Sequence, residues 1–278
     1  MHLIGLKLKK LNPQLRWVAD FRDPWSELDL LNEFHLSKYS RKKHKKLEKE
    51  VLQTADLTLT VSETWLKDFK RLGARKVALI TNGYDPDDFE LKTKTHNKFI
   101  IGHYGLLNHL RNPKKLWHAL NSLCEDNSEF ESRLEIHLSG NIDSQILDEI
   151  YNSYPLLQSK IKNLGYLSHS DVLRQYNEAD ILLLLLFNSK SGEGNYPGKI
   201  FEYFAAQKPI LAFGPNNSDT KNLITDLDLG VYLSYESSNI QQEVLRLFNG
   251  DFSLAKRKLD KFSRKELTNK LSLLLNQL

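Results

Sequence analysis

Residues 181–187 read Ile-Leu-Leu-Leu-Leu-Leu-Phe and form the longest apolar run in the chain. A short, continuous apolar run bounded by polar residues is typical of a strand that is buried on both faces of a parallel sheet. The run is much shorter than the ~20 apolar residues that a transmembrane helix needs. It therefore predicts a buried parallel strand over Ile181–Leu186.

Further short apolar runs alternate with amphipathic helical patterns on both sides of this strand. Strands are expected at 16–21, 57–61, 76–80, 99–103, 134–138, 161–164, 209–212 and 230–233. Helices are expected at 36–54, 63–72, 113–123, 143–151, 170–178, 199–206 and 219–226, with two more before the end of the chain. Strands that alternate with helices imply parallel βαβ units and a doubly wound α/β fold.

The polar stretch 86–97 contains Pro86 and is interpreted as a domain linker. It divides the chain into residues 1–95 and residues 96–278. The second part is long enough for a complete Rossmann-like domain, whereas the first has only about three expected strands. The first part therefore looks like a Rossmann-like domain without its opening strands, and we expect it to expose a sheet edge or an apolar face.

Composition restricts the cellular setting. The chain has 278 residues and one cysteine, Cys124, so it forms no internal disulfide, which fits a reducing compartment. Cys124 is expected to pack on the apolar face of a helix. The first ten residues place their charges after their apolar side chains, the reverse of a signal peptide. We therefore expect a cytoplasmic protein.

Positive charge is concentrated in the first part of the chain. Residues 1–95 hold 19 Lys and Arg against 14 Asp and Glu, whereas the remainder holds 20 against 21. The run Arg41-Lys42-Lys43-His44-Lys45-Lys46 is either a solvated helix face or a patch for anionic lipids on the inner membrane face, where each basic residue contributes about 1 kcal/mol. Nucleic acid is not expected as a partner, because the sequence lacks zinc-ligand spacing, an aromatic RNA-binding signature and strong overall basicity.

Three loops follow expected strands and precede expected helices. Open α/β sheets bind their ligands at such loops, beyond the carboxyl ends of the strands. The first, 102–113, contains Gly105, which permits close approach of the backbone to a phosphate, and Arg111, a planar donor for a diphosphate. A solvated surface charge is the alternative interpretation of Arg111. The second, Ser139-Gly140-Asn141, either lines the same crevice or is a plain turn.

The third loop, 187–197, is rich in glycine and leads into a helix that begins near Gly198. Lys199 lies at the start of this helix, where a cation is disfavoured unless an anion is bound. Glu202 is three residues further on and shares the same helical face, so its carboxylate could accept hydrogen bonds from the hydroxyls of a ribose. The alternative interpretation is a surface ion pair between Lys199 and Glu202.

Four motifs resemble those of glycosyltransferase family 4, a group of retaining enzymes with the GT-B architecture, and they occur along the chain in the order that the family shows. Pro197–Tyr203, continued by Ala206–Ala212, resembles the donor-site signature of the family. Residues 61–89, with Asn82-Gly83-Tyr84-Asp85, resemble its strand-helix-strand and linker. Asp20–Trp25 is similar to its His-Asp segment, and 102–113 resembles its glycine-rich loop. The resemblance runs from about residue 15 to the end of the chain.

The resemblance implies a metal-independent glycosyltransferase of the hexosyltransferase type, without a cofactor, that uses a nucleotide sugar as co-substrate. The acceptor would be a saccharide or a lipid-linked sugar in cell-envelope polysaccharide synthesis. Lys199 and Arg111 would neutralise the leaving diphosphate, which is often the largest catalytic contribution. Glu202 would bind the ribose, Gly105 would let its loop approach the phosphates, and Gly198 would be a further donor-binding residue.

The resemblance also places Tyr166 and Leu167 beside the base, and Arg22 and Asp23 toward the acceptor or the donor sugar, with Asp23 among the catalytic residues. Two departures from the family pattern stand out. Many members carry a second Glu eight positions before the ribose-binding one, where this chain has Gly194, and the nearest carboxylate is that of Glu193. The family His is Arg22 here, and Arg cannot act as a general base.

These departures keep a second interpretation open. The chain could be a nucleotide-sugar-binding remnant without catalysis, or one part of a split enzyme.

Overall fold

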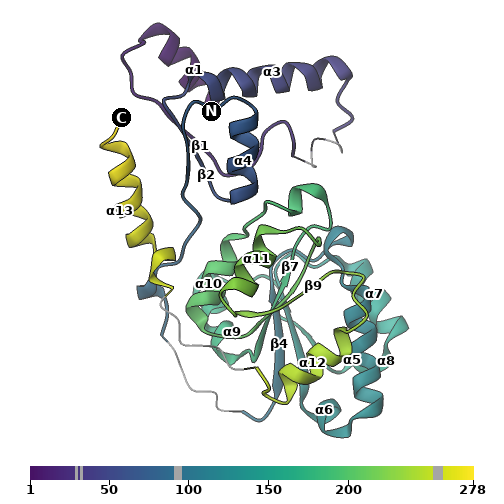
Figure 1. The fold of residues 1–278 in the computed structure, drawn as a ribbon. Helices are drawn as coiled ribbons and strands as arrows, with labels where there is room; N and C mark the ends of the chain where they lie inside the picture. Colours follow the sequence, from purple (N-terminus) through teal and green to yellow (C-terminus); the bar gives the residue numbers. More distant parts are fainter. Residues whose placement is uncertain (29–30, 32–33, 91–95, 253–258) are drawn as a thin grey trace. The chain divides into compact units, whose positions relative to one another are not determined.

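The computed structural model describes residues 1–28, 31, 34–90, 96–252 and 259–278. The chain forms two compact units (Figure 1). Unit 1 comprises residues 1–84, 189–198 and 260–278, and unit 2 comprises residues 85–188 and 199–259. Both units are α/β, as the alternating pattern predicts.

Unit 1 is built on three parallel strands in the order β1-β2-β3, namely β1 (Val18–Phe21), β2 (Leu57–Thr60) and β3 (Val77–Leu79). Its helices are α1 (His2–Leu11), α3 (Lys38–Thr54), α4 (Glu63–Arg71) and α13 (Arg264–Leu275). Helix α4 begins at the expected cap, because the side chain of Ser62 accepts a hydrogen bond from the backbone N–H of Trp65. It ends before Gly73, which has a φ of 99°.

Helix α13 explains why these units differ from the expected division at residues 95 and 96. Leu267, Leu271 and Leu274 lie on one face of α13 and pack against the core residues Leu57 and Leu59 of β2. The last helix of the chain therefore belongs to the first unit. Its leucines predict a helix with an apolar face, but nothing in their spacing says which sheet that face covers.

Helix α1 has no counterpart among the expected elements. Its side chain Leu6 is buried with Val51 and Leu52 of α3, and Lys9 forms an ion pair of 2.8 Å with Asp56. The leucine and lysine spacing at 2–11 is amphipathic, yet the segment lacks a capping side chain at Met1 and was not expected to fold as a helix.

Unit 2 is built on six parallel strands in the order β6-β5-β4-β7-β8-β9. The strands are β4 (Phe99–Tyr104), β5 (Leu134–Ser139), β6 (Ile161–Asn163), β7 (Ile181–Leu185), β8 (Ile210–Phe213) and β9 (Gly230–Leu233). The chain moves outward from β4 to β6 and then crosses to β7, so the strand order reverses between β4 and β7. Crevices at such a reversal are the usual ligand sites of open α/β sheets.

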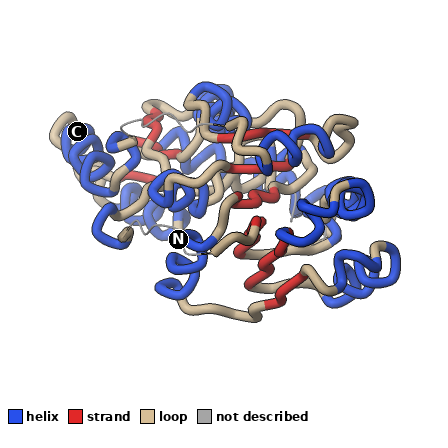
Figure 2. Tube along the Cα trace, turned by 90° about the horizontal axis from the view of Figure 1, so that it is seen from below, coloured by secondary structure: helices blue, strands red, loops and turns tan. Residues whose placement is uncertain are grey.

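Helices cover both faces of this sheet, and Figure 2 shows them in blue around the red strands. They are α5 (Lys114–Asp126), α6 (Ser128–Arg133), α7 (Ser144–Ser153), α8 (Pro155–Gln158), α9 (His169–Glu178), α10 (Gly198–Ala206), α11 (Asp219–Asp226) and α12 (Ile240–Phe248). All five residues of β7 are buried, which confirms the expected central strand. Cys124 is also buried in the core of unit 2, as expected.

Candidate functional site

Three glycines with positive φ angles lie where β4, β5 and β6 end. They are Gly105, Gly140 and Gly165, with φ angles of 155°, 110° and 65°. The backbone N–H of Gly105 donates to the carbonyl of Ser139 at 2.7 Å, and that of Gly140 donates to the carbonyl of Gly165 at 2.9 Å. A Cβ atom on Gly140 would lie 2.6 Å from the carbonyl oxygen of Gly105. The three loops are joined by backbone hydrogen bonds, and at Gly140 the neighbouring backbone leaves no room for a side chain.

Lys199 reaches this glycine-lined edge from the first turn of α10. Its Nζ donates to the carbonyl of Tyr104 at 3.3 Å and lies 2.9 Å from the position that a Cβ on Gly105 would occupy. Loss of hydration, together with the nearby charge of Arg111, lowers the pKa of Lys199 to about 7. An anion bound here would restore the charged form.

Arg111 lies in the loop that follows β4. Its guanidinium carbon is 3.8 Å from the centroid of the Phe187 ring, and loss of hydration lowers its pKa. The Nε atom is buried and has no hydrogen-bond partner within the described part of the chain. Burial of a hydrogen-bond donor of a charged group costs free energy unless a ligand accepts its hydrogen bond. The buried Nε favours a ligand-binding role for Arg111 over that of a solvated surface charge.

Glu202 lies one turn along α10 from Lys199. Its Oε2 accepts a hydrogen bond of 2.9 Å from the hydroxyl of Tyr176, and its Oε1 lies 3.1 Å from Nε2 of His169. Burial raises the pKa of Tyr176, which keeps this hydroxyl a donor. The carboxylate is thus held by one buried partner and one partner with a side chain 58% exposed. This pairing replaces the surface ion pair of Lys199 with Glu202, which does not form among the described residues.

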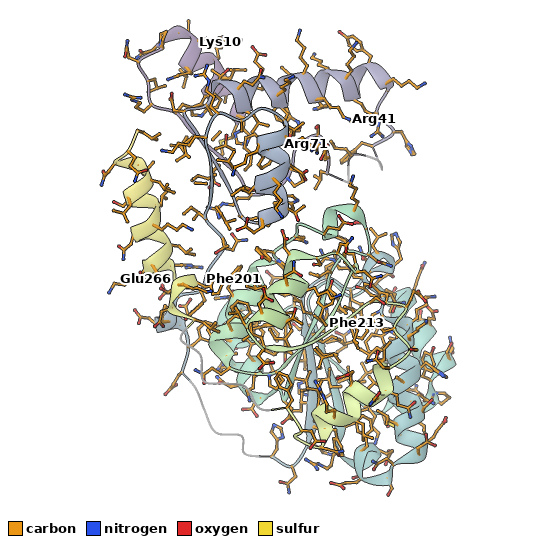
Figure 3. All side chains as sticks on the ribbon, viewed as in Figure 1. Lys10, Arg41, Arg71, Phe201, Phe213 and Glu266 are labelled. Carbon is orange, nitrogen blue, oxygen red and sulfur yellow. The ribbon has the colours of Figure 1, made fainter. Side chains whose placement is uncertain are left out.

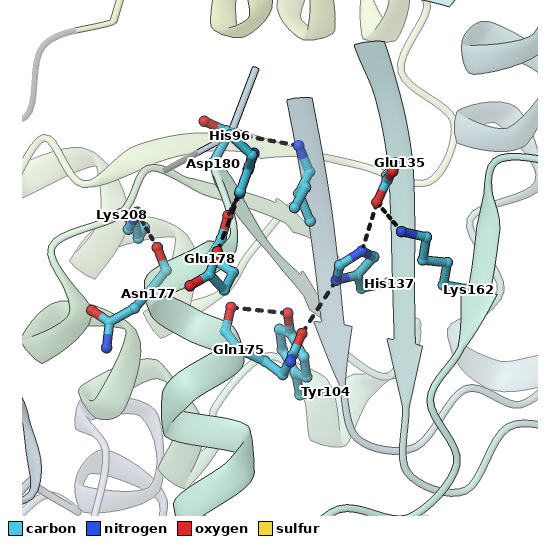
Figure 4. A network of polar contacts seen from close by, with 11 residues as sticks. His96, Tyr104, Glu135, His137, Lys162, Gln175, Asn177, Glu178, Asp180 and Lys208 are labelled. Carbon is cyan, nitrogen blue, oxygen red and sulfur yellow. Dashed lines mark hydrogen bonds and ion pairs between the residues drawn. The ribbon is translucent and has the colours of Figure 1, made fainter. Parts of the chain in front are cut away.

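Tyr176 and His169 were not among the expected site residues. Both lie on α9, whose position depends on a polar network seen in Figure 4. Tyr104 donates from its hydroxyl to the carbonyl of Gln175 at 3.2 Å, and the side chain of Gln175 lies 3.3 Å from Nδ1 of His137. These contacts join residues far apart in the sequence, so no spacing rule could have revealed them.

The other expected donor residues are less constrained. Tyr166 is 92% exposed, and Leu167 is partly exposed in the same loop after β6. A Cβ on Gly198 would meet no atom within 4 Å. The assignment of Gly198 to the donor site therefore has no steric support of the kind that Gly105 and Gly140 have.

The expected acceptor residues lie in unit 1, after β1. Arg22 forms an ion pair of 2.9 Å with Asp20, and its Nη1 donates to the side chain of Asn82 at 3.3 Å. Arg22 therefore joins the loops that follow β1 and β3. The carboxyl of Asp23 has its pKa raised by loss of hydration.

The departure at Gly194 has a physical cause. A Cβ there would lie 2.4 Å from Nε1 of Trp65, so this position has no room for the Glu of the family pattern. Glu193, the neighbouring carboxylate, lines a cavity of unit 1.

No group of three or more His, Cys, Asp or Glu side chains among the described residues is arranged to hold a metal ion. None of the described helices combines the length and the apolar character that crossing a membrane would require.

The structure is similar to solved structures of glycosyltransferases. Sucrose-phosphate synthase from Thermosynechococcus elongatus is 14% identical over 99% of this chain and 71% of that chain, with a TM-score of 0.69. A glycosyltransferase from Rickettsia africae ESF-5 is 16% identical over 99% of this chain and 80% of that chain, also with a TM-score of 0.69. The pneumococcal O-GlcNAc transferase GtfA, in complex with UDP and GlcNAc, is 15% identical over 84% of this chain and 47% of that chain, with a TM-score of 0.61.

No family model matches the sequence, and no curated protein matches it. At identities of 14–16% the structural likeness establishes the fold, which is that of the GT-B glycosyltransferases. The chain spans less than half the length of GtfA.

Proposed function

We propose that the chain transfers a sugar, with retention at the anomeric carbon, from a nucleotide-sugar donor to a saccharide or lipid-linked acceptor. The observation that carries this proposal is the meeting of Lys199 and Arg111 beside Gly105, at the strand reversal of unit 2. Two cationic side chains with no ion-pair partner among the described residues, next to a glycine that brings no side chain of its own, suit a diphosphate.

The transfer requires a stabilised leaving group. When the bond from the anomeric carbon to the diphosphate breaks, negative charge grows on the departing nucleotide, and Arg111 and Lys199 would neutralise it. Because these two cations can supply that charge, we propose a metal-independent reaction and expect EDTA to leave the rate unchanged. Glu202, oriented by Tyr176, would accept hydrogen bonds from the ribose hydroxyls.

Unit 1 would supply the acceptor side. Asp23 is the candidate to receive the proton of the acceptor hydroxyl, since a carboxyl with a raised pKa is a better proton acceptor than an ordinary one. Arg22 is already paired with Asp20, so we assign it to positioning the loop rather than to proton transfer. We further propose that the product belongs to an envelope polysaccharide. The chain would bind the inner membrane face through residues 41–46 of α3.

Calorimetric titration with UDP, GDP and their sugar conjugates tests the donor site. We expect binding that falls about tenfold or more in Glu202→Ala, since removing a charged hydrogen-bond acceptor costs about 1.5–3 kcal/mol. Glu149→Ala, which removes an exposed carboxylate from α7 in the same unit, should bind like the unchanged chain. Equal affinity in the two variants would remove the assigned role of Glu202, and no nucleotide binding at all would overturn the proposal.

Turnover separates catalysis from binding alone. Release of the nucleotide in the presence of donor and acceptor supports a transferase. The environment of Gly194, which leaves no room for the family's second carboxylate, favours the non-catalytic remnant as the second candidate. Nucleotide binding without any turnover, even after the chain is supplemented with upstream residues or a second protein, would decide for that candidate.

A further inference from the structure

Unit 1 contains a cavity of about 600 Å³ that the donor site does not use. Its lining residues include Lys38, Arg41, Lys42, Lys45, Trp65 and Glu193. The four cationic residues come from the first two turns of α3, at a spacing that places them on one face of the helix. Figure 3 labels Arg41 at this end of α3.

The helix end itself adds to the positive character of the cavity. Helix α3 has 17 residues, and its first turn contains no acidic side chain to balance the positive end of the helix dipole. Lys38 and Arg41 lie in that turn, where cations are electrostatically disfavoured. An anion in the cavity would interact favourably with both the helix dipole and the lysines.

The acidic residues of the cavity do not pair with Lys42 or Lys45. Glu27 and Asp68 both line the wall, but Arg71 of α4, labelled in Figure 3, lies 3.5 Å and 3.0 Å from their carboxylates. Lys42 and Lys45 have no ion-pair partner among the described residues. The segment 189–198 contributes one charge of each sign, from Lys190 and Glu193.

The lining of the cavity also contains an indole side chain, that of Trp65. Trp65 is buried, and a Cβ on Gly194 would lie 2.4 Å from its Nε1. Next to the cavity, the indole N–H of Trp25 donates to Nδ1 of His44 at 3.1 Å. A cavity lined by both cations and an indole suits a ligand that carries both a charged group and an apolar face, such as a phosphorylated sugar.

We propose that this cavity, which the lysines of α3 and Trp65 line, binds the phosphate group of an anionic acceptor, a phosphorylated saccharide. The acceptor assignment rests on the proposed function, whereas phosphate binding does not. The same phosphate chemistry is offered by lipid headgroups, so the experiment must separate a soluble sugar phosphate from a membrane surface.

The test compares two double variants of the same helix. Lys42→Gln with Lys45→Gln removes charge from the cavity, and Lys43→Gln with Lys46→Gln removes equal charge from α3 side chains outside it. Calorimetry with glucose 6-phosphate, and with glucose as the neutral control, measures binding. We expect the cavity variant to bind the sugar phosphate roughly tenfold more weakly, with the matched variant within about twofold of the unchanged chain.

Three outcomes would overturn the proposal: no binding of glucose 6-phosphate, binding as strong as that of glucose, or an equal loss in both variants. Sedimentation with phosphatidylglycerol vesicles tests whether the basic residues bind a membrane surface and not a soluble sugar phosphate. Vesicle binding that both variants weaken equally, without sugar-phosphate binding, would assign the basic run to lipid instead. Nucleotide titration of the cavity variant serves as an independent control, because loss of the phosphate cavity should leave the affinity of unit 2 for UDP intact.

Discussion

The ammonium group of Lys199 occupies the space that a side chain on Gly105 would need, 2.9 Å from the Cβ position. Gly105→Ala should therefore push Lys199 out of place and also strain the backbone, whose φ is 155°. The strain costs about 1–3 kcal/mol, and nucleotide affinity should fall by more than tenfold. Titration with UDP measures the affinity, and thermal denaturation measures the strain.

Gly250→Ala is the matched control for this substitution. Gly250 lies in the same unit with a φ of 76°, and a Cβ there would meet no atom within 4 Å. It should lose stability while keeping its nucleotide affinity. If both variants lose affinity equally, the effect arises from backbone strain and not from Lys199.

The lowered pKa of Lys199 predicts that donor binding depends on pH. A diphosphate binds the charged amine and raises its pKa, so affinity should be constant below pH 7 and fall by up to tenfold per pH unit above it. A nucleotide sugar is the suitable probe, because its diphosphate diester does not titrate between about pH 6 and pH 9. Lys199→Gln should bind more weakly at every pH, and a sloping profile in that variant would contradict the assignment.

Tyr176 fixes the carboxylate of Glu202 from the buried side. Tyr176→Phe keeps the ring and removes a hydrogen bond to a charged group, so nucleotide affinity should fall by roughly tenfold. Tyr232→Phe is the control, since it deletes a comparable hydroxyl hydrogen bond, of 2.8 Å to the carbonyl of Pro215, elsewhere in unit 2. Loss of affinity in the control alone would show that Glu202 does not depend on Tyr176.

Leu271 tests whether α13 supports unit 1. Leu271→Ala removes a partly buried side chain from the cluster around Leu57 and Leu59 and should cost about 1–2 kcal/mol, less than the 2–5 kcal/mol of a fully buried leucine. Hydrogen exchange should rise in β2 and β3 and stay unchanged in β7. Leu273→Ala, on the exposed side of α13, should change neither.

Much of the fold could be predicted from local pattern, because buried strands such as β7 and capped helices such as α4 carry their signals within a few residues. The helices α6 and α8 span only six and four residues, too short for a helical period to stand out. At the candidate site, the spacing of Lys199 and Glu202 in the sequence fits a surface ion pair as well as it fits two ligand-binding residues. The partner of Glu202 is a tyrosine from another helix, and only the packing of α9 brings it there.

The return of the chain to its first unit has a consequence for the order of events during synthesis. Residues 85–188 and 199–259 leave the ribosome before α13 exists, so unit 2 can complete its sheet while unit 1 still lacks a covering helix. During that interval the apolar face over Leu57 and Leu59 is open to water, to chaperones or to another nascent chain. Within this chain, unit 1 is thus begun before unit 2 and completed after it.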